Sequence, residues 1–142
     1  MGRIVIKTDA STRNDSGSGL AYQAIVFDRD DGGDVIEYKN RRYIESNVSS
    51  TDSEMYAVIY TLQKVYRTIN NWDDTKKYDV VVESDCDYAV STVNMENYKD
   101  KKMRRYVSFY RNKFDGLRAR WIPRSENTVA DSMARTTLQH AQ

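Results

Sequence analysis

Apolar and polar residues alternate along the first part of the chain in the pattern of β-strands. Residues 3–9 (RIVIKTD) alternate and are rich in β-branched side chains. Residues 19–28 and 35–45 show the same kind of pattern, and the polar segment 29–34 (RDDGGD) between them is typical of a hairpin turn. We therefore expect an antiparallel meander of three strands, with the strand 3–9 in a central position.

Helical spacing dominates the second part of the chain. Residues 54–69 follow the polar segment 46–53 and carry apolar residues three or four positions apart, which predicts a helix. Residues 78–85 are almost wholly apolar, as expected of a buried parallel strand. The remaining elements are predicted in this order: a short helix through 89–93, a helix over 101–114, a strand over 117–122, and a last helix capped by Asn127 and running through Leu138. This order predicts an α/β fold, a mixed sheet with helices packed on it.

Length and composition are those of one domain covering residues 1–142. Hydrophobic residues make up 39% of the chain, enough for a core, and no apolar stretch is long enough to cross a bilayer. The N-terminal residues MGRIVIKTDA do not resemble a secretory signal. We therefore expect a monomeric cytoplasmic protein without a membrane partner.

Cysteine and histidine are too scarce for several kinds of chemistry. The chain has one cysteine, Cys86, and one histidine, His140, near the end of the sequence. They cannot build a zinc site, which needs three or four nitrogen or sulfur ligands, and they are unsuited to a nucleophilic pair. A bound metal would need oxygen ligands, which selects Mg²⁺ or Mn²⁺. We expect no small-molecule organic cofactor. With a net charge of +1, nucleic-acid contacts would have to come from a local patch.

Four carboxylates stand out from the other acidic residues because of their positions on the predicted elements. Asp9 and Asp85 end predicted strands, Glu54 lies on the apolar face of a predicted helix, and Asp131 lies near the start of the last helix. Each position has an ordinary explanation. Asp9 could begin a turn, Asp85 could cap the next helix, and Asp131 could favour a helix N-terminus. Glu54 could close a capping box with Thr51.

Taken together, the four carboxylates suggest a metal cluster. If the two strands are parallel neighbours, Asp9 and Asp85 emerge at the same edge of the sheet, where helix starts can meet them. Four anionic groups in one place repel each other unless cations neutralise them. Two divalent ions held in this way can activate water and stabilise the leaving oxygen of an in-line displacement. This arrangement favours phosphodiester cleavage.

Four motifs in order along the chain resemble the type 1 ribonuclease H family. They are T-D-A-S at 8–11, T-D-S-E-M-Y-A-V at 51–58, V-V-V-E-S-D at 80–85 and W-I-P-R-S-E-N-T-V-A-D-S-M-A-R at 121–135. The resemblance covers nearly the whole chain. It implies a ribonuclease H-like fold with a five-stranded mixed sheet, three strands antiparallel and two parallel, flanked by helices. It also implies hydrolysis of the RNA strand of an RNA–DNA hybrid, leaving 5′-phosphate and 3′-hydroxyl ends.

The resemblance implies roles for the four carboxylates. Asp9, Glu54, Asp85 and Asp131 would be the metal ligands and catalytic residues for two Mg²⁺ ions, for which Mn²⁺ can substitute. We expect Asp9 to bridge both ions, Glu54 and Asp85 to complete one site, and Asp131 to complete the other. Two other functions stay open at this stage. One is a non-catalytic nucleic-acid-binding module of the same fold, and the other is a related nuclease that also cuts double-stranded RNA.

Two features depart from many members of the family. The loop P-R-S-E-N lacks the histidine found there, as in the short archaeal and plant-like form, so Arg124 is the candidate for that role. Arg124 is permanently charged and could hold a phosphate or water without transferring a proton, or it could simply pair with Glu126. The basic protrusion is also missing. Instead a basic run could contact backbone phosphates or be a solvated helix face: Lys101, Lys102, Arg104 and Arg105.

Small polar residues near the predicted site could read the hybrid. The 2′-hydroxyl groups of RNA are accessible in the wide minor groove, and helix N-termini bind phosphate. Candidates for 2′-hydroxyl contacts follow Asp9 in the chain: Ser11, Thr12 and Asn14. Candidates for phosphate contacts lie at the start of the first helix: Ser49, Ser50 and Thr51. The predicted partner is therefore an RNA–DNA hybrid.

Overall fold

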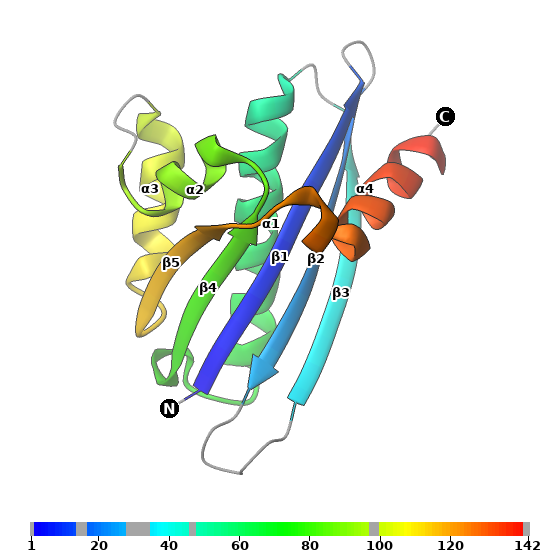
Figure 1. Ribbon diagram of the computed structural model, residues 1–142. Helices are drawn as coiled ribbons and strands as arrows, with labels where there is room; N and C mark the ends of the chain where they lie inside the picture. Colours follow the sequence, from blue (N-terminus) through cyan, green and yellow to red (C-terminus); the bar gives the residue numbers. More distant parts are fainter. Residues whose placement is uncertain (1, 14–16, 28–34, 46–47, 97–99, 141–142) are drawn as a thin grey trace.

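The computed structural model of the protein describes residues 2–13, 17–27, 35–45, 48–96 and 100–140 (Figure 1). The predicted turn at 29–34 and the candidate Asn14 lie outside these residues. The strands are β1 (Gly2–Arg13), β2 (Gly17–Phe27), β3 (Val35–Ile44), β4 (Tyr78–Ser84) and β5 (Gly116–Trp121). The helices are α1 (Ser50–Asn70), α2 (Asp87–Val93), α3 (Lys101–Arg111) and α4 (Thr128–His140), with two 3₁₀ turns, η1 (Thr75–Lys77) and η2 (Arg124–Glu126).

The five strands form one mixed sheet in the order β3-β2-β1-β4-β5. β1, β2 and β3 pair antiparallel, whereas β4 runs parallel to β1, and β5 parallel to β4. Figure 1 shows α1 behind the sheet and α4 in front of it, on the side of β1, β2 and β3. The predicted α/β fold, with three antiparallel and two parallel strands, is confirmed, as is the central position of β1.

Apolar residues at the predicted periods form the core between the sheet and α1. Ile4 and Ile6 of β1 are fully buried, as are Val58 and Leu62 of α1. β4 is buried along almost its whole length, as expected for a parallel strand inside a sheet. Burial of this apolar surface is the main favourable contribution to folding, and it determines which face of α1 turns toward the sheet.

The end of β1 differs from the sequence prediction in a way that matters for the site. Asp9 does not end the strand, because β1 continues to Arg13 and stays paired with β2 as far as Gly17. The pairing of β1 with β4, in contrast, stops at Lys7 and Glu83. Asp9 therefore lies in a strand that projects beyond its parallel neighbour, so that one side of Asp9 is open to residues that follow β4.

Three other bounds shift by a few residues. β4 ends at Ser84, so Asp85 is the first residue after the strand. α1 begins at Ser50, four residues before Glu54. α3 ends at Arg111, and Phe114, placed in that helix by its spacing, is a fully buried residue of the following turn. None of the helices in the described ranges is long and apolar enough to span a membrane.

Candidate active site

Asp9 is the most central of the four carboxylates. Its side chain is 4% exposed, although it lies beyond the last pair of β1 and β4. Burial, followed by the neighbouring Asp131, raises the pKa of Asp9 to about 7. Desolvation disfavours the charged form of a carboxylate, so Asp9 at neutral pH requires either a proton or a nearby cation.

Glu54 reaches Asp9 from α1 and does not cap its own helix. The N-cap of α1 is Ser49, whose hydroxyl oxygen accepts a hydrogen bond from the Asp52 amide at 3.1 Å. Glu54 Oε1 instead accepts a hydrogen bond from the Ala10 amide of β1 at 3.3 Å. The capping-box interpretation with Thr51 is therefore wrong, because the backbone next to Asp9 uses the same carboxylate.

The second oxygen of Glu54 is a buried acceptor that lacks a partner. Within the described ranges, no group donates a hydrogen bond to Glu54 Oε2. Burial, followed by the negative charge of Asp9, raises the pKa of Glu54 to about 9. A buried carboxylate oxygen without a donor is costly, and a bound cation would remove that cost.

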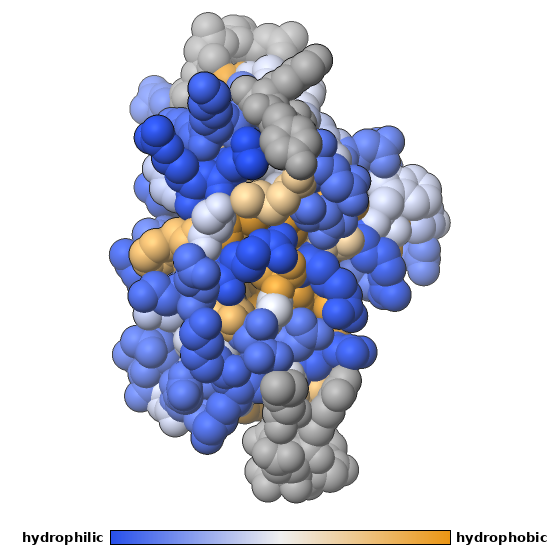
Figure 2. Space-filling model, turned by 90° about the vertical axis from the view of Figure 1, so that its left-hand side faces the viewer, coloured by the Kyte–Doolittle hydropathy of each residue, from blue (hydrophilic) through white to orange (hydrophobic). Residues whose placement is uncertain are grey.

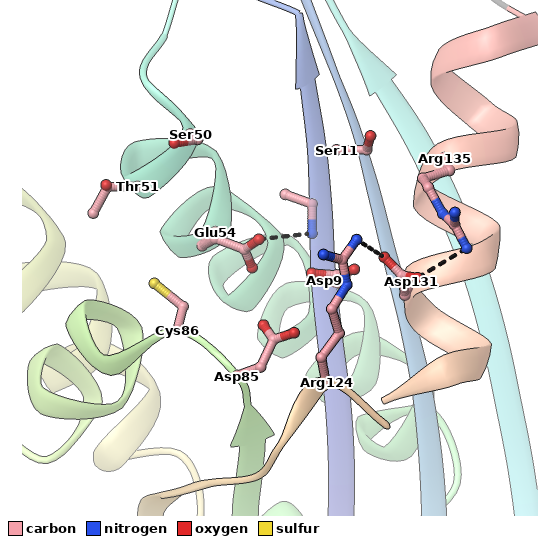
Figure 3. A pocket seen from close by; sticks show the side chains of 11 residues that line it. Asp9, Ser11, Ser50, Thr51, Glu54, Asp85, Cys86, Arg124, Asp131 and Arg135 are labelled. Atoms are coloured by element: carbon pink, nitrogen blue, oxygen red, sulfur yellow. Dashed lines mark hydrogen bonds and ion pairs between the residues drawn. The ribbon is translucent and has the colours of Figure 1, made fainter. Parts of the chain in front are cut away.

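Asp85 completes the group from the end of β4. The residue at the N-cap position of α2 is Cys86, so Asp85 does not cap that helix. Its backbone is tied to β5, since Trp121 Nε1 donates a hydrogen bond to the Asp85 carbonyl at 3.2 Å. The Asp85 side chain points toward Glu54 and Asp9 (Figure 3), and partial burial raises its pKa above the ordinary value.

Three carboxylates thus converge on one point. Asp9, Glu54 and Asp85 each offer an oxygen, and these three oxygens lie within 4.8 Å of one another. Burial is the largest cause of the raised pKa of each of these three residues, and the negative charge of a neighbouring carboxylate adds to it. A set of carboxylate oxygens at this spacing fits a hard divalent cation, which would bind the charged forms.

Asp131 faces Asp9 from α4 and already has cationic partners. Its Oδ1 lies 3.4 Å from Arg124 Nη2, and its Oδ2 lies 3.0 Å from Arg135 Nη2 (Figure 3). Arg124 pairs with Asp131, so the alternative pairing with Glu126 is wrong. Sequence reasoning missed Arg135, although its position four residues after Asp131 on one helix predicts such a pair.

Asn127 fixes the start of α4 against β1. It precedes α4 as expected and its carbonyl accepts the Asp131 amide at 3.1 Å, but its side chain does not cap the helix. Asn127 Nδ2 donates instead to the Thr8 carbonyl at 2.8 Å, and the residue is fully buried. This hydrogen bond joins the residue before Asp9 to the helix turn that carries Asp131, so it sets the separation of these two carboxylates.

The carboxylates open into a pocket of about 400 Å³. Its lining includes the four predicted carboxylates, Arg124 and three of the predicted polar contacts: Ser11, Ser50 and Thr51. Sequence reasoning missed three lining residues, Ala10, Cys86 and Arg135. Thr12 and Ser49 do not line the pocket. The Thr12 hydroxyl is 3.0 Å from Ser18 Oγ, and Ser49 caps α1.

The predicted basic residues lie on α3, apart from this pocket. Lys101, Lys102 and Arg105 are exposed there, and Arg104 is half-buried. None of the four lines the carboxylate pocket. Lys102 contacts α1, with its Nζ 5.8 Å from the centre of the Tyr56 ring.

The sheet order, the flanking helices and the acidic cluster define a ribonuclease H fold. LC11 ribonuclease H1, isolated from compost by a metagenomic approach, has been solved with an RNA/DNA hybrid. It matches with a TM-score of 0.77 and 19% identity over 97% of this chain and 98% of that one. Ribonuclease H1 of Halobacterium salinarum NRC-1 matches with a TM-score of 0.71 and 17% identity over 97% and 98% of the two chains.

A family model and one sequence relative extend this result. The model described as reverse transcriptase-like matches residues 7–137, so the chain belongs to this family. The relative is the EbsB protein of Enterococcus faecalis strain ATCC 700802 / V583, which bears a provisional name as a hydrolase. It is 30% identical over 95 residues, which cover 65% of this chain and 67% of EbsB.

Proposed function

We propose that this protein is a metal-dependent endoribonuclease that hydrolyses the RNA strand of RNA–DNA hybrids, leaving 5′-phosphate and 3′-hydroxyl ends. The observation that carries the proposal is the convergence of Asp9, Glu54 and Asp85 oxygens within 4.8 Å, at the edge of a ribonuclease H sheet. The hybrid bound to the structurally similar LC11 ribonuclease H1 supports the choice of substrate. The match to the reverse transcriptase-like family is consistent with a nucleic-acid substrate.

The four carboxylates would hold two Mg²⁺ ions, with Mn²⁺ as a substitute. Asp9 would bridge the two ions, Glu54 and Asp85 would complete one site, and Asp131 would complete the other. Bound divalent ions supply Lewis acidity, which activates water and stabilises the leaving oxygen. Glu54 Oε2, which has no hydrogen-bond donor among the described residues, supports this assignment because it needs a cation or a proton.

The cations around Asp131 would hold the scissile phosphate and orient the carboxylate. Arg124 is 72% exposed in its side chain, so it can turn toward a bound phosphate while remaining near Asp131. A guanidinium group stays protonated and can make two parallel hydrogen bonds to a phosphate. Arg124 would therefore bind the phosphate or the attacking water but transfer no proton, and Arg135 would keep Asp131 oriented toward Asp9.

Polar residues around the pocket would distinguish the RNA strand of the hybrid from the DNA strand. Ser50 and Thr51 line the pocket from the first turn of α1, and the N-terminus of a helix favours a phosphate. Ser11 lines the pocket and would contact a 2′-hydroxyl group. The other predicted contacts remain part of the proposal: Thr12 and Asn14 for 2′-hydroxyl groups, Ser49 for phosphate, and Lys101, Lys102, Arg104 and Arg105 on α3 as sites for backbone phosphate.

A cleavage assay with matched substrates tests the proposal. A labelled RNA–DNA hybrid should be cut with Mg²⁺ or Mn²⁺ and should stay intact with EDTA. Asp9→Asn should reduce cleavage by about a thousandfold or more, because the bridging ligand is lost. Duplex DNA should be resistant, and duplex RNA tests the broader nuclease. If the wild-type protein binds the hybrid without cutting it under any metal condition, the non-catalytic function replaces the proposed one.

A further inference from the structure

The outward face of α3 contains a groove whose aromatic residues have no role in the proposed cleavage of the hybrid. We call it the α3 groove and define it by its lining: Lys102, Arg105, Tyr106, Phe109 and Tyr110. Its volume is about 440 Å³. Phe109 is 50% exposed and Tyr106 is 42% exposed, and both rings belong to this lining. Figure 2 faces the side of the molecule with α3 and shows mostly hydrophilic side chains, with hydrophobic ones in its central part.

The charge of this helix is of one sign. α3 has the sequence KKMRRYVSFYR, with five lysine or arginine residues and no acidic residue. Lys113, just after the helix, adds another cation, with Nζ 5.0 Å from the centre of the Phe109 ring. A polyanion is therefore the partner that the charges of this face complement.

The exposed aromatic rings indicate which kind of polyanion this groove would bind. In a duplex the bases are stacked inside, and a protein surface beside it meets phosphates and sugars. Unpaired nucleotides have free base faces, which stack on aromatic side chains while cations follow the backbone. Phe109 and Tyr106, set among Lys102 and Arg105, match this second pattern. A neighbouring hollow with Lys101, Arg104 and Ser108 has no aromatic lining, so it suits phosphate alone.

We propose that the α3 groove binds an unpaired nucleic-acid strand that extends from the hybrid held at the carboxylate pocket. The position of α3 supports this, because α3 lies beside α1, the helix that carries Glu54: Lys102 Nζ is 5.8 Å from the centre of the Tyr56 ring, on a side of α1 that Glu54 does not face. The eleven residues of α3 span about 16 Å, the length of four or five stacked nucleotides at about 3.4 Å each. The identity of the strand as a flank of the hybrid rests on the proposed function, whereas the affinity of the groove for single strands does not.

Binding measurements without cleavage test this proposal. Asp9→Asn protein is titrated with a blunt RNA–DNA hybrid, with the same hybrid carrying a ten-nucleotide oligothymidine extension, and with free oligothymidine. The extension should increase affinity for the hybrid by about tenfold. Adding Tyr106→Ala and Phe109→Ala should abolish this gain and weaken binding of free oligothymidine by about tenfold or more. Trp72→Ala is the matched control, since Trp72 is an exposed ring beyond the other end of α1.

A salt titration gives a second measurement that does not depend on the aromatic variants. Lys102→Gln with Arg105→Gln should lower the slope of log affinity against log salt for oligothymidine by about 1.4, because two phosphate contacts are lost. Lys76→Gln, an exposed lysine of η1, should leave the slope as it is. Unchanged binding in both sets of groove variants overturns the proposal, as does an extension that adds no affinity.

Sedimentation of the same proteins tests whether a second copy of the chain, and not a nucleic-acid strand, covers the α3 groove. A wild-type dimer that becomes a monomer on Phe109→Ala would show that a second copy covers the groove, and it would also overturn the proposal. The proposed function is tested separately. It fails if the wild-type protein binds the extended hybrid through the α3 groove but never cuts it in Mg²⁺ or Mn²⁺.

Discussion

The two halves of the carboxylate pocket differ in how the negative charge of their carboxylates is compensated. On one side, Asp9, Glu54 and Asp85 converge within 4.8 Å, and burial raises their pKa values. On the other side, Asp131 is neutralised by Arg124 and Arg135, at 3.4 Å and 3.0 Å. The first side needs a cation from solution, whereas the second side has the guanidinium groups of Arg124 and Arg135 as its cations. This difference predicts that metal binding depends mainly on the first side and substrate binding mainly on the second.

The largest expected effect is a loss of catalysis when a carboxylate of the Asp9, Glu54 and Asp85 side is replaced. Glu54→Gln should keep the hydrogen bond from the Ala10 amide and the fold, but should lower kcat/KM for hybrid cleavage by about a thousandfold, because a metal ligand is lost. Arg135→Ala should lower it by about tenfold. Steady-state kinetics on one hybrid at saturating Mg²⁺ measures both. Equal losses in the two variants would contradict the division between the halves.

The next effect concerns stability as a function of pH. The pKa of Asp9 is about 7 in the folded protein and 3.8 in the ordinary case, so the metal-free folded state binds a proton more tightly than the unfolded chain. Metal-free stability should therefore fall as pH rises above about 4, and the fall should continue towards pH 9, because the pKa of Glu54 is raised to about 9. Urea unfolding in EDTA measures this fall.

Two additions to that experiment identify the cause. Asp9→Asn should remove much of the fall, whereas Asp87→Asn, which changes an exposed carboxylate, should follow the wild type. Adding Mg²⁺ at pH 8 should stabilise the wild type by about 2.7 kcal/mol when its concentration is a hundred times Kd. A pH profile that is flat in EDTA would show that the cluster is not strained.

A smaller effect on stability is expected from the Asn127–Thr8 hydrogen bond, which connects the two halves of the pocket. Asn127→Ala leaves the Thr8 carbonyl without its donor and should destabilise the protein by about 2 kcal/mol. It should also weaken metal binding, because the separation of Asp9 and Asp131 is no longer held. Asn94→Ala is a matched control, since the Asn94 amide bonds both backbone groups of Ala119 in β5, away from the pocket. It should lower stability to a similar degree while leaving metal affinity, measured by calorimetry, as in the wild type.

The smallest effect on stability is expected from the arginine side. Arg124→Ala combined with Arg135→Ala should raise KM for the hybrid by about tenfold while changing the free energy of unfolding by less than about 1 kcal/mol, because both arginines are largely exposed. Arg118→Ala breaks an exposed pair with Asp79 at 3.3 Å and should change neither quantity much. A double variant with wild-type KM would mean that Arg124 does not contact the substrate.

Local patterns determined much of the fold. Alternation predicted β1 to β3, helical spacing predicted α1 and α4, and the apolar run predicted β4, because strands and helices bury one face at fixed periods. The four carboxylates were also identified before any coordinates, from charges placed at element ends or on an apolar face. The bounds of β1 were the main error. Strand length depends on the partner, and β2 extends the pairing four residues past Asp9.

The sequence by itself determined the order and type of the elements and the acidic residues at issue, since periodicity and charge are local properties. Tertiary structure alone decided that Glu54 bonds the Ala10 amide and not its own helix start, across 44 residues, and that Asn127 holds Thr8 across 119. It also decided that Thr12 faces Ser18 and that Arg135 joins the pocket. These are choices among several partners for one polar group, and they depend on which distant backbone atoms folding brings within hydrogen-bond range.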